Sequence, residues 1–309
     1  MLLPVAALLL SLVVGAPAEN AAPAPNVWSA SGARPWTTCQ EYEGEATRRL
    51  RAGLPRGEER KLYTVWRARL SACPNVPDAL VLMALLEVAN PPRVDPAEDF
   101  IASLAALDIA YREQREEILR LLAAADLEAR RRDGSPPSPS HYLAAYAAIG
   151  LGDPARARPL VDTAREAAEV ESWRIDRLSA LLALAEGDLQ TALRLALRAQ
   201  IHATTAGKPA STYVLALVLD RAGSITAARG LLERLKLREA RTLGGLDTLL
   251  PVRDRLYLLA LDQEARGHNA GAYALWQAYL ERDGVEAPER EQVRRRLIEL
   301  RPAVGIASE

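Results

Sequence analysis

The sequence predicts an all-α protein built from antiparallel helix hairpins that follow one another along the chain. Three observations predict this class. One pattern of small, glycine and large positions is written four times between residues 138 and 282. Two shorter helical patterns, separated by a Gly/Pro break, lie between the two cysteines. Leu and Ile recur at helical spacing in residues 96–133, opposite a charged face.

The repeat is anchored on one glycine in each copy. An alanine stands seven residues before it, a second alanine five residues after it, and a leucine eight residues after it. The glycines are Gly152, Gly187, Gly223 and Gly267, the preceding alanines Ala145, Ala180, Ala216 and Ala260, the following alanines Ala157, Ala192, Ala228 and Ala272, and the leucines Leu160, Leu195, Leu231 and Leu275. Three columns in phase in all four copies indicate a repeat.

Packing explains the columns. Two helices approach closely only where small side chains face each other, and a leucine on the next turn fills the groove beside them. Glycine is expected to end the first helix because it adopts the left-handed conformation at little steric cost. Asp153 and Asp188 directly follow a turn glycine, so each is expected to cap the second helix of its hairpin.

The spacing of the glycines, 35, 36 and 44 residues, and the order small, glycine, small, large resemble the tetratricopeptide repeat family. Residues 150–164 and 184–199 carry the resemblance, which covers about half of the mature chain. It implies a TPR-like α-solenoid. Two departures stand out: Ala and Leu replace most of the family's aromatic residues in the first helix, and the long last interval predicts an elaborated loop at residues 242–251.

The resemblance also implies a concave groove for a protein or peptide, lined by positions ten, six and three before each turn glycine. These positions, with the neighbouring Arg221, supply the predicted binding residues. They are Tyr142, Tyr146, Arg177, Tyr213, Asp220, Arg221, Tyr257 and Glu264. Tyrosine and arginine are typical of binding hot spots. The alternative is that the tyrosines pack against the next hairpin. Only Arg177 and Arg221 match the positions with which family members capture a terminal carboxylate, so that activity is not expected.

The first 38 residues precede the predicted helical body. Residues 1–18 resemble an export signal, with a short apolar run and a small-x-small cleavage pattern at Ala16-Pro17-Ala18. An uncleaved anchor is the alternative, because no Lys or Arg stands before Arg34. No cysteine lies near the cleavage point, so lipid attachment is not expected. Residues 19–38 predict an Ala/Pro-rich tether.

Cys39 and Cys73, the only two cysteines, are predicted to form a disulfide. The helical patterns 40–52 and 57–72 lie between them, and in an antiparallel hairpin the start of the first helix lies beside the end of the second. Exported proteins commonly join such a pair, and closing this loop stabilises the fold by about 4 kcal/mol. A redox or metal pair is the alternative, without a Cys-x-x-Cys motif to support it.

The remaining segments complete the predicted organisation. Residues 39–133 form an irregular, disulfide-linked helical section that includes a helix at 78–89 and a short and then a long helix within 96–133. The Ser/Pro-rich stretch 133–139 separates it from the repeats. Residues 283–301 predict a polar capping helix, at about 287–300, which carries the arginine run 294–296.

Composition and motifs argue against several functions. The net charge of −1 disfavours nucleic acid as a main partner. The sequence has no phosphate-binding loop, His-Glu-x-x-His motif, nucleophile elbow or dinucleotide turn. Its three histidines are scattered, so neither a metal nor another cofactor is expected. An enzyme is therefore not expected.

The sequence as a whole favours a non-catalytic, exported scaffold or adaptor that binds a protein or peptide partner of the cell envelope. It would be periplasmic or secreted, with membrane contact only through an uncleaved signal. The excess of Arg over Lys (three lysines among 39 basic residues) and the many Ala, Leu and Pro residues are typical of a GC-rich bacterial genome. The alternative is a protein that binds or processes cell-wall or carbohydrate fragments. The sequence leaves the partner's identity and the oligomeric state open.

Overall fold

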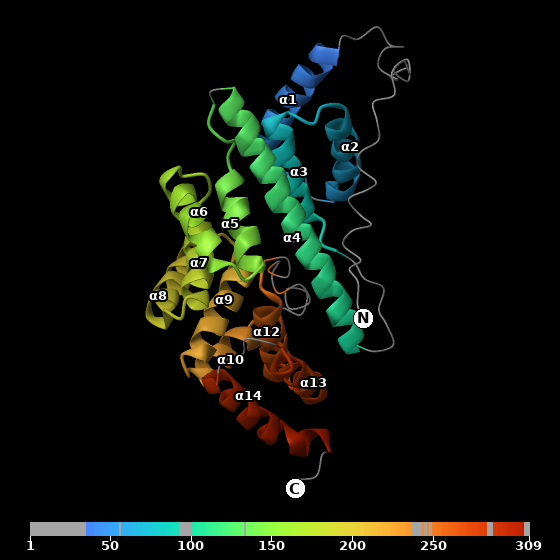
Figure 1. Ribbon diagram of the computed structural model, residues 1–309. Helices are drawn as coiled ribbons and strands as arrows, with labels where there is room; N and C mark the ends of the chain where they lie inside the picture. The colour runs from blue at the N-terminus through green and yellow to red at the C-terminus, as the bar shows by residue number, and fades with distance from the viewer. Residues whose placement is uncertain are drawn as a thin grey trace, which may run out of the picture. The chain divides into compact units, whose positions relative to one another are not determined.

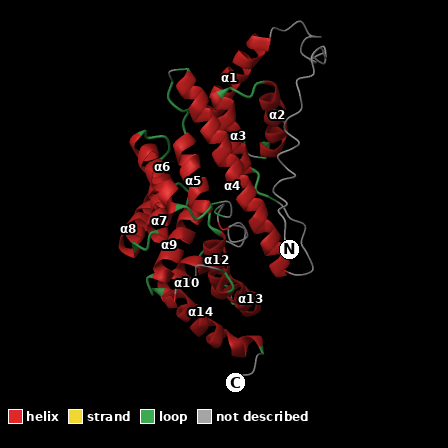
Figure 2. Ribbon diagram, in the orientation of Figure 1, coloured by secondary structure: helices red, strands yellow, loops and turns green. Residues whose placement is uncertain are grey.

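The computed structural model describes residues 35–55, 57–92, 100–132, 134–235, 243, 246, 249–282 and 287–305. These residues form helices joined by turns, with no strand among them (Figure 2). The all-α prediction is therefore confirmed for this part of the chain. The predicted signal 1–18 and residues 19–34 of the predicted tether lie outside it.

The chain separates into two compact units, residues 1–42 and 43–309. Helix α1 (Pro35–Ala52) begins inside the segment predicted as a tether. It is followed by α2 (Glu59–Ala72), α3 (Pro77–Ala89) and α4 (Phe100–Arg131). Two helices were predicted within 96–133, but a single helix runs from Phe100 to Arg131. Cys39 and Cys73 are both disulfide-bonded, which confirms the predicted pairing.

The four predicted repeats each form two consecutive helices (Figure 1). The predicted glycine lies in the turn between the two helices of each repeat. The pairs are α5 (Ser140–Gly150) with α6 (Pro154–Glu166), α7 (Ser172–Ala185) with α8 (Leu189–His202), α9 (Lys208–Arg221) with α10 (Ile225–Glu233), and α12 (Val252–Ala265) with α13 (Asn269–Leu280). Helix α14 (Ala287–Leu300) and the 3₁₀ turn η4 (Arg301–Val304) follow.

The repeat columns have the packing that their chemistry requires. All eight column alanines have no exposed surface. In the leucine column Leu275 is buried, and its three counterparts are half-buried. Each turn glycine has φ between +73° and +83°. The backbone N–H of the residue after each glycine donates to the carbonyl five residues before that residue, as Asp153 donates to Ala148. This is the glycine-ended helix terminus that the pattern predicts.

Two of the second helices begin with the predicted caps. The Asp153 carboxylate accepts the N–H of Arg156, and the Asp188 carboxylate accepts the N–H of Thr191, both at 3.0 Å. The bonds from Thr191 lower the pKa of Asp188, because they favour its charged form. These bonds satisfy N–H groups that would otherwise lack a partner in the first turn of each helix.

The two helices of a hairpin differ in burial. From α4 to α14, each described helix packs against the next described helix, and α5 also contacts α7, as α7 does α9 and α9 does α12. The first helices are therefore enclosed: α9 buries most of its length. The second helices bury one side only, so that α8 buries Ala192, Ala196 and Ala199 and exposes Leu197 and Ile201.

The last hairpin departs from a uniform stack. The Tyr213 hydroxyl on α9 donates to Asp262 on α12 at 3.0 Å, while the Tyr257 hydroxyl on α12 donates to Asp220 on α9 at 2.6 Å. Early positions of each helix thus meet late positions of the other, so the two helices face each other in opposite senses. Equivalent helices of a uniform stack would run in the same sense. The departure follows the long interval before the fourth glycine.

Candidate functional site

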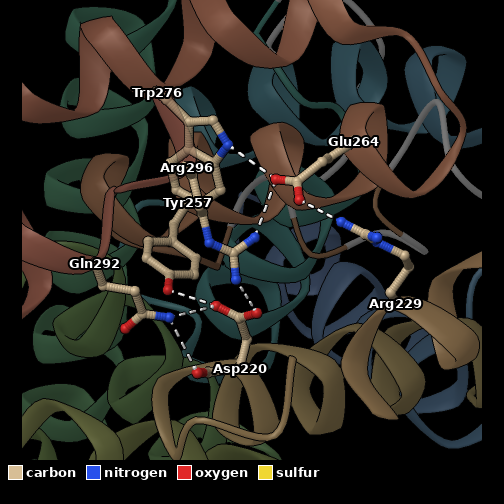
Figure 3. Close-up of polar contacts among 7 residues, drawn as sticks. All are labelled: Asp220, Arg229, Tyr257, Glu264, Trp276, Gln292 and Arg296. Carbon is tan, nitrogen blue, oxygen red and sulfur yellow. Dashed lines mark hydrogen bonds and ion pairs between the residues drawn. The ribbon is translucent and has the colours of Figure 1, made fainter. Parts of the chain in front are cut away.

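The candidate site is the surface that α9, α12 and α13 present to α14. The side chains of α14 at positions i, i+3 and i+7 reach onto this surface: Glu289, Gln292 and Arg296. Arg290, next to Glu289, donates to the Leu280 carbonyl at the end of α13 at 3.1 Å. These positions lie on one face of a helix. Arg296 lies at the centre, and Figure 3 shows how the surrounding side chains converge on its guanidinium group.

Arg296 is 4% exposed, and its guanidinium binds two carboxylates from different helices. Its Nη2 donates to Asp220 of α9, and its Nη1 donates to Glu264 of α12 at 3.0 Å (Figure 3). The guanidinium carbon also lies 5.2 Å from the centre of the Trp276 ring. Burial lowers the pKa of Arg296, but Asp220 and Glu264 outweigh burial and raise it, so Arg296 stays charged.

Other donors satisfy the remaining oxygens of both carboxylates. Asp220, which has no exposed surface, accepts the Tyr257 hydroxyl at 2.6 Å and the Gln292 amide at 3.2 Å. Glu264 accepts the indole N–H of Trp276 at 3.2 Å and a guanidinium N–H of the half-exposed Arg229 at 2.6 Å. Tyr257, Trp276 and Arg229, which lie outside α14, therefore hold the carboxylates in place together with Gln292 and Arg296 of α14.

A second ion pair adjoins the first. Arg221 donates to Asp254 at 2.6 Å and lies 3.6 Å from Glu289, which in turn accepts the Tyr279 hydroxyl at 2.6 Å. Burial lowers the pKa of Arg221, but Asp254 and Glu289 outweigh it and raise the pKa overall. Arg221 thus stays charged and joins α9 to both α12 and α14.

Aromatic rings form the floor of the site. Tyr257, Trp276 and Tyr279 meet edge to face, with ring centres 4.8–6.1 Å apart. Burial is the main cause that raises the pKa of Tyr213, Tyr257 and Tyr279, here called the buried tyrosines, and a neighbouring carboxylate raises each further. Their hydroxyls therefore remain protonated and act as hydrogen-bond donors. Rings and carboxylates together form the kind of environment that holds a guanidinium group.

Little free space remains around Arg296. A cavity of about 10 Å³ lies between Asp220, Arg229, Glu264 and Arg296, which is less than a ligand needs. The site is filled by the side chain of α14 itself. Each carboxylate of the site is committed to an ion pair and to hydrogen bonds. The site therefore recognises a cation through carboxylates and aromatic rings.

The structure separates the predicted binding residues into two groups. Asp220, Arg221, Tyr257 and Glu264 come together in this site, whereas Tyr213 bonds to Asp262 of α12, which forms its own ion pair with Arg266. The other three lie on earlier hairpins. Tyr142 and Tyr146 are neighbours on α5, with ring centres 6.1 Å apart, and Arg177 lies over the Trp173 ring on α7.

All four predicted tyrosines are at most 6% exposed, as is Asp220, and Arg177 is 8% exposed. Side chains buried to this degree do not present contact area to a guest. The burial favours the alternative that the tyrosines pack within the protein. The partners of this face that sequence reasoning missed are on α14. Their signal in the sequence was the i, i+3, i+7 spacing of Glu289, Gln292 and Arg296, with apolar Val293 and Leu300 on the same side.

A larger groove, of about 590 Å³, lies between α6 and α8 with α7 as its floor. Arginines line it, but most are already paired. Arg158 binds Glu186, Arg198 lies 3.2 Å from Asp176, and Arg165 lies 3.0 Å from Asp162. Because these charges are neutralised within the groove, it is a weaker candidate than the α14 site.

Among the described residues, His, Cys, Asp and Glu side chains do not gather in any group of three that could hold a metal ion. In the same part of the chain, no helix has a stretch long and apolar enough to cross a membrane. No family model matches this chain, and no curated protein matches it either. Function must therefore be argued from the geometry of the chain's own residues.

Proposed function

We propose that this protein is a non-catalytic, exported scaffold that binds a protein or peptide segment of the cell envelope. The hairpins would form a TPR-like α-solenoid, and the partner segment would bind α9 and α12 where α14 lies. The buried alanine columns and the left-handed turn glycines support the solenoid, because they allow close packing in every copy.

One observation carries the binding proposal: the surface of α9 and α12 already holds a helix. Helix α14 is held there by Glu289, Gln292 and Arg296. Their partners include three of the predicted binding residues, which are Asp220, Arg221 and Glu264. A surface that holds one helix through specific side-chain contacts has the chemistry for holding another. Helix recognition by a groove of fixed side chains is a common mode of protein binding.

Export is supported by the disulfide between Cys39 and Cys73, since such bonds persist in oxidising compartments. The apolar run and cleavage pattern of residues 1–18 support it as well. Nucleic acid is not a proposed partner, because the net charge of −1 supplies no positive field.

Site-specific photo-crosslinking in the producing cell tests the proposal. A photoreactive residue replaces Ile225, which is 40% exposed and lines the small cavity beside Arg229 and Glu264. The matched control replaces Leu127 of α4, which is 50% exposed. We expect a discrete crosslinked protein from position 225 and none from position 127, identified by mass spectrometry of the excised product.

Equal crosslinking at both positions, or none at position 225, would reject this face as the binding surface. Co-sedimentation of the purified protein with isolated cell-wall material tests the carbohydrate alternative. Saturable sedimentation that is unaffected by protease treatment of the cell wall would favour that alternative over a protein partner.

A further inference from the structure

We propose that Asp220, Glu264 and Trp276 form a receptor for an arginine side chain on a partner helix, and that α14 occupies this receptor through Arg296 in the free protein. This inference rests on the proposed function and specifies the partner: an amphipathic helix that carries an arginine and competes with α14. Three observations support it.

The first observation is the charge that Arg296 neutralises. Without Arg296, the two carboxylates of the receptor would face one nearby cation, Arg229, which binds Glu264 from the rim. Gln292 leaves together with α14, so of its described bonds Asp220 would keep the one from the neutral hydroxyl of Tyr257. A buried carboxylate without a cation is unfavourable, so the empty receptor selects a positive group.

The second observation is that the receptor is built for a guanidinium group. Two different nitrogens of Arg296 reach carboxylates on two different helices, while the Trp276 ring lies 5.2 Å from the guanidinium carbon. A planar fork of donors satisfies this arrangement, whereas the single nitrogen of a lysine does not span it. The receptor therefore discriminates arginine from lysine.

The third observation is that α14 is held mainly by polar contacts. Val293, Arg296 and Leu300 are its buried residues among those whose side chains are described, while Ile298 is 60% exposed. Helix α9, by contrast, is buried along most of its length. Elements with few buried apolar contacts open first in a folded protein, so α14 is the element that a competing helix displaces.

The contacts of α14 define the residues that a competitor needs. Glu289 binds Arg221 and Tyr279, Gln292 follows three residues later, and Arg296 follows after four more. Val293 supplies an apolar contact on the same side. The matching partner helix reads acidic, x, x, Gln, apolar, x, x, Arg.

Fluorescence anisotropy with a labelled synthetic peptide of residues 287–305 tests the inference on the full-length chain. Two forms of the protein are compared, the unchanged chain and the Arg296→Ala chain, in which α14 has lost its central contact. We expect the peptide to bind the Arg296→Ala chain about ten-fold more tightly, because its own α14 competes less well. Gln292→Ala removes the two hydrogen bonds of this side chain to Asp220. It is expected to change binding in the same direction by a smaller factor, and it replaces Arg296→Ala if that chain does not fold.

Peptide variants test the arginine itself. An Arg296→Lys peptide is expected to bind about ten-fold more weakly than the unchanged peptide, and an Arg295→Ala peptide, altered at an exposed position, equally well. Equal binding of the unchanged and Arg296→Lys peptides, or equal binding by the two protein chains, overturns the inference. A crosslink at position 225 without arginine-dependent peptide binding rejects the receptor but not the proposed function. Arginine-dependent peptide binding without a crosslinked partner rejects the proposed function but not the receptor.

Discussion

The close approach of α7 and α9 leads to a sharp prediction about Gly207. This glycine is the N-cap of α9 and lies against the Trp173 ring of α7. A Cβ atom added at Gly207 would overlap the ring, lying 2.6 Å from Cζ3 and 2.9 Å from Cζ2 and closer still to Cη2. The ring has little freedom to move, because it is 5% exposed and lies next to the guanidinium groups of Arg174 and Arg177.

Gly207→Ala is therefore expected to lower the free energy of unfolding. The backbone conformation at Gly207, with φ at −90°, suits alanine, so the loss comes from the overlap and from the lower preference of alanine for the N-cap position. Inserting atoms into a packed core destabilises by about 1–3 kcal/mol. Gly230→Ala in α10 is the matched control, since a Cβ there meets nothing within 4 Å. Both changes remove one glycine from the same unfolded chain, so the effect on the unfolded chain cancels in their difference.

Urea unfolding followed by circular dichroism measures both variants. We expect Gly207→Ala to lie about 1–3 kcal/mol below Gly230→Ala, and Gly230→Ala to equal or exceed the unchanged protein by up to about 1 kcal/mol. Adding Trp173→Leu to Gly207→Ala should recover part of the loss, because the smaller side chain leaves room for the Cβ. Equal stability of the two glycine variants would refute the tight packing of α7 on α9.

Three further predictions test other parts of the structure. Folding raises the pKa of each buried tyrosine above 10.0, its pKa in the unfolded chain, so their contribution to stability is fully present below pH 10.0 and falls as the pH rises above it. The absorbance of tyrosinate from these residues should therefore appear together with unfolding. Ionisation of all tyrosines before unfolding would contradict this. Replacing Cys39 and Cys73 by serine should lower the free energy of unfolding by about 4 kcal/mol in denaturant titrations, and reducing agent should have no further effect on that variant. Asp188→Ala removes a capping bond and should destabilise by about 0.5–2 kcal/mol, whereas Ser224→Ala, at a cap without a side-chain bond, should change little; a loss as large at Ser224 would count against the cap.

Local patterns in the sequence predicted much of the fold. The turn glycines predicted where four first helices end, since glycine alone takes a left-handed conformation at little cost. The alanine columns predicted the packed sides of the helices, as at Ala180 and Ala192, which have no exposed surface. The single helix α4 was missed, because a short and a long helix were predicted where its N-terminal part continues without interruption.

The candidate site was predicted in part. Position relative to the turn glycine brought Asp220 and Glu264 together, and both do bind one group. The identity of that group could not be read from the repeat, because Arg296 stands in a run with Arg294 and Arg295, which are exposed. Charge runs usually indicate a solvated helix face, so the run itself does not distinguish the buried Arg296 from its two exposed neighbours.

The amino-acid sequence by itself determined the elements that depend on neighbours in the chain: the helices, their glycine-ended turns, the aspartate caps and the alanine sides that pack. Tertiary structure alone decided that the fourth hairpin turns against the third, and that α14 closes over the face they share. The physical reason is range. Helix ends and packing sides follow from contacts within a few residues, whereas the place of Arg296 depends on carboxylates 32 and 76 residues away along the chain.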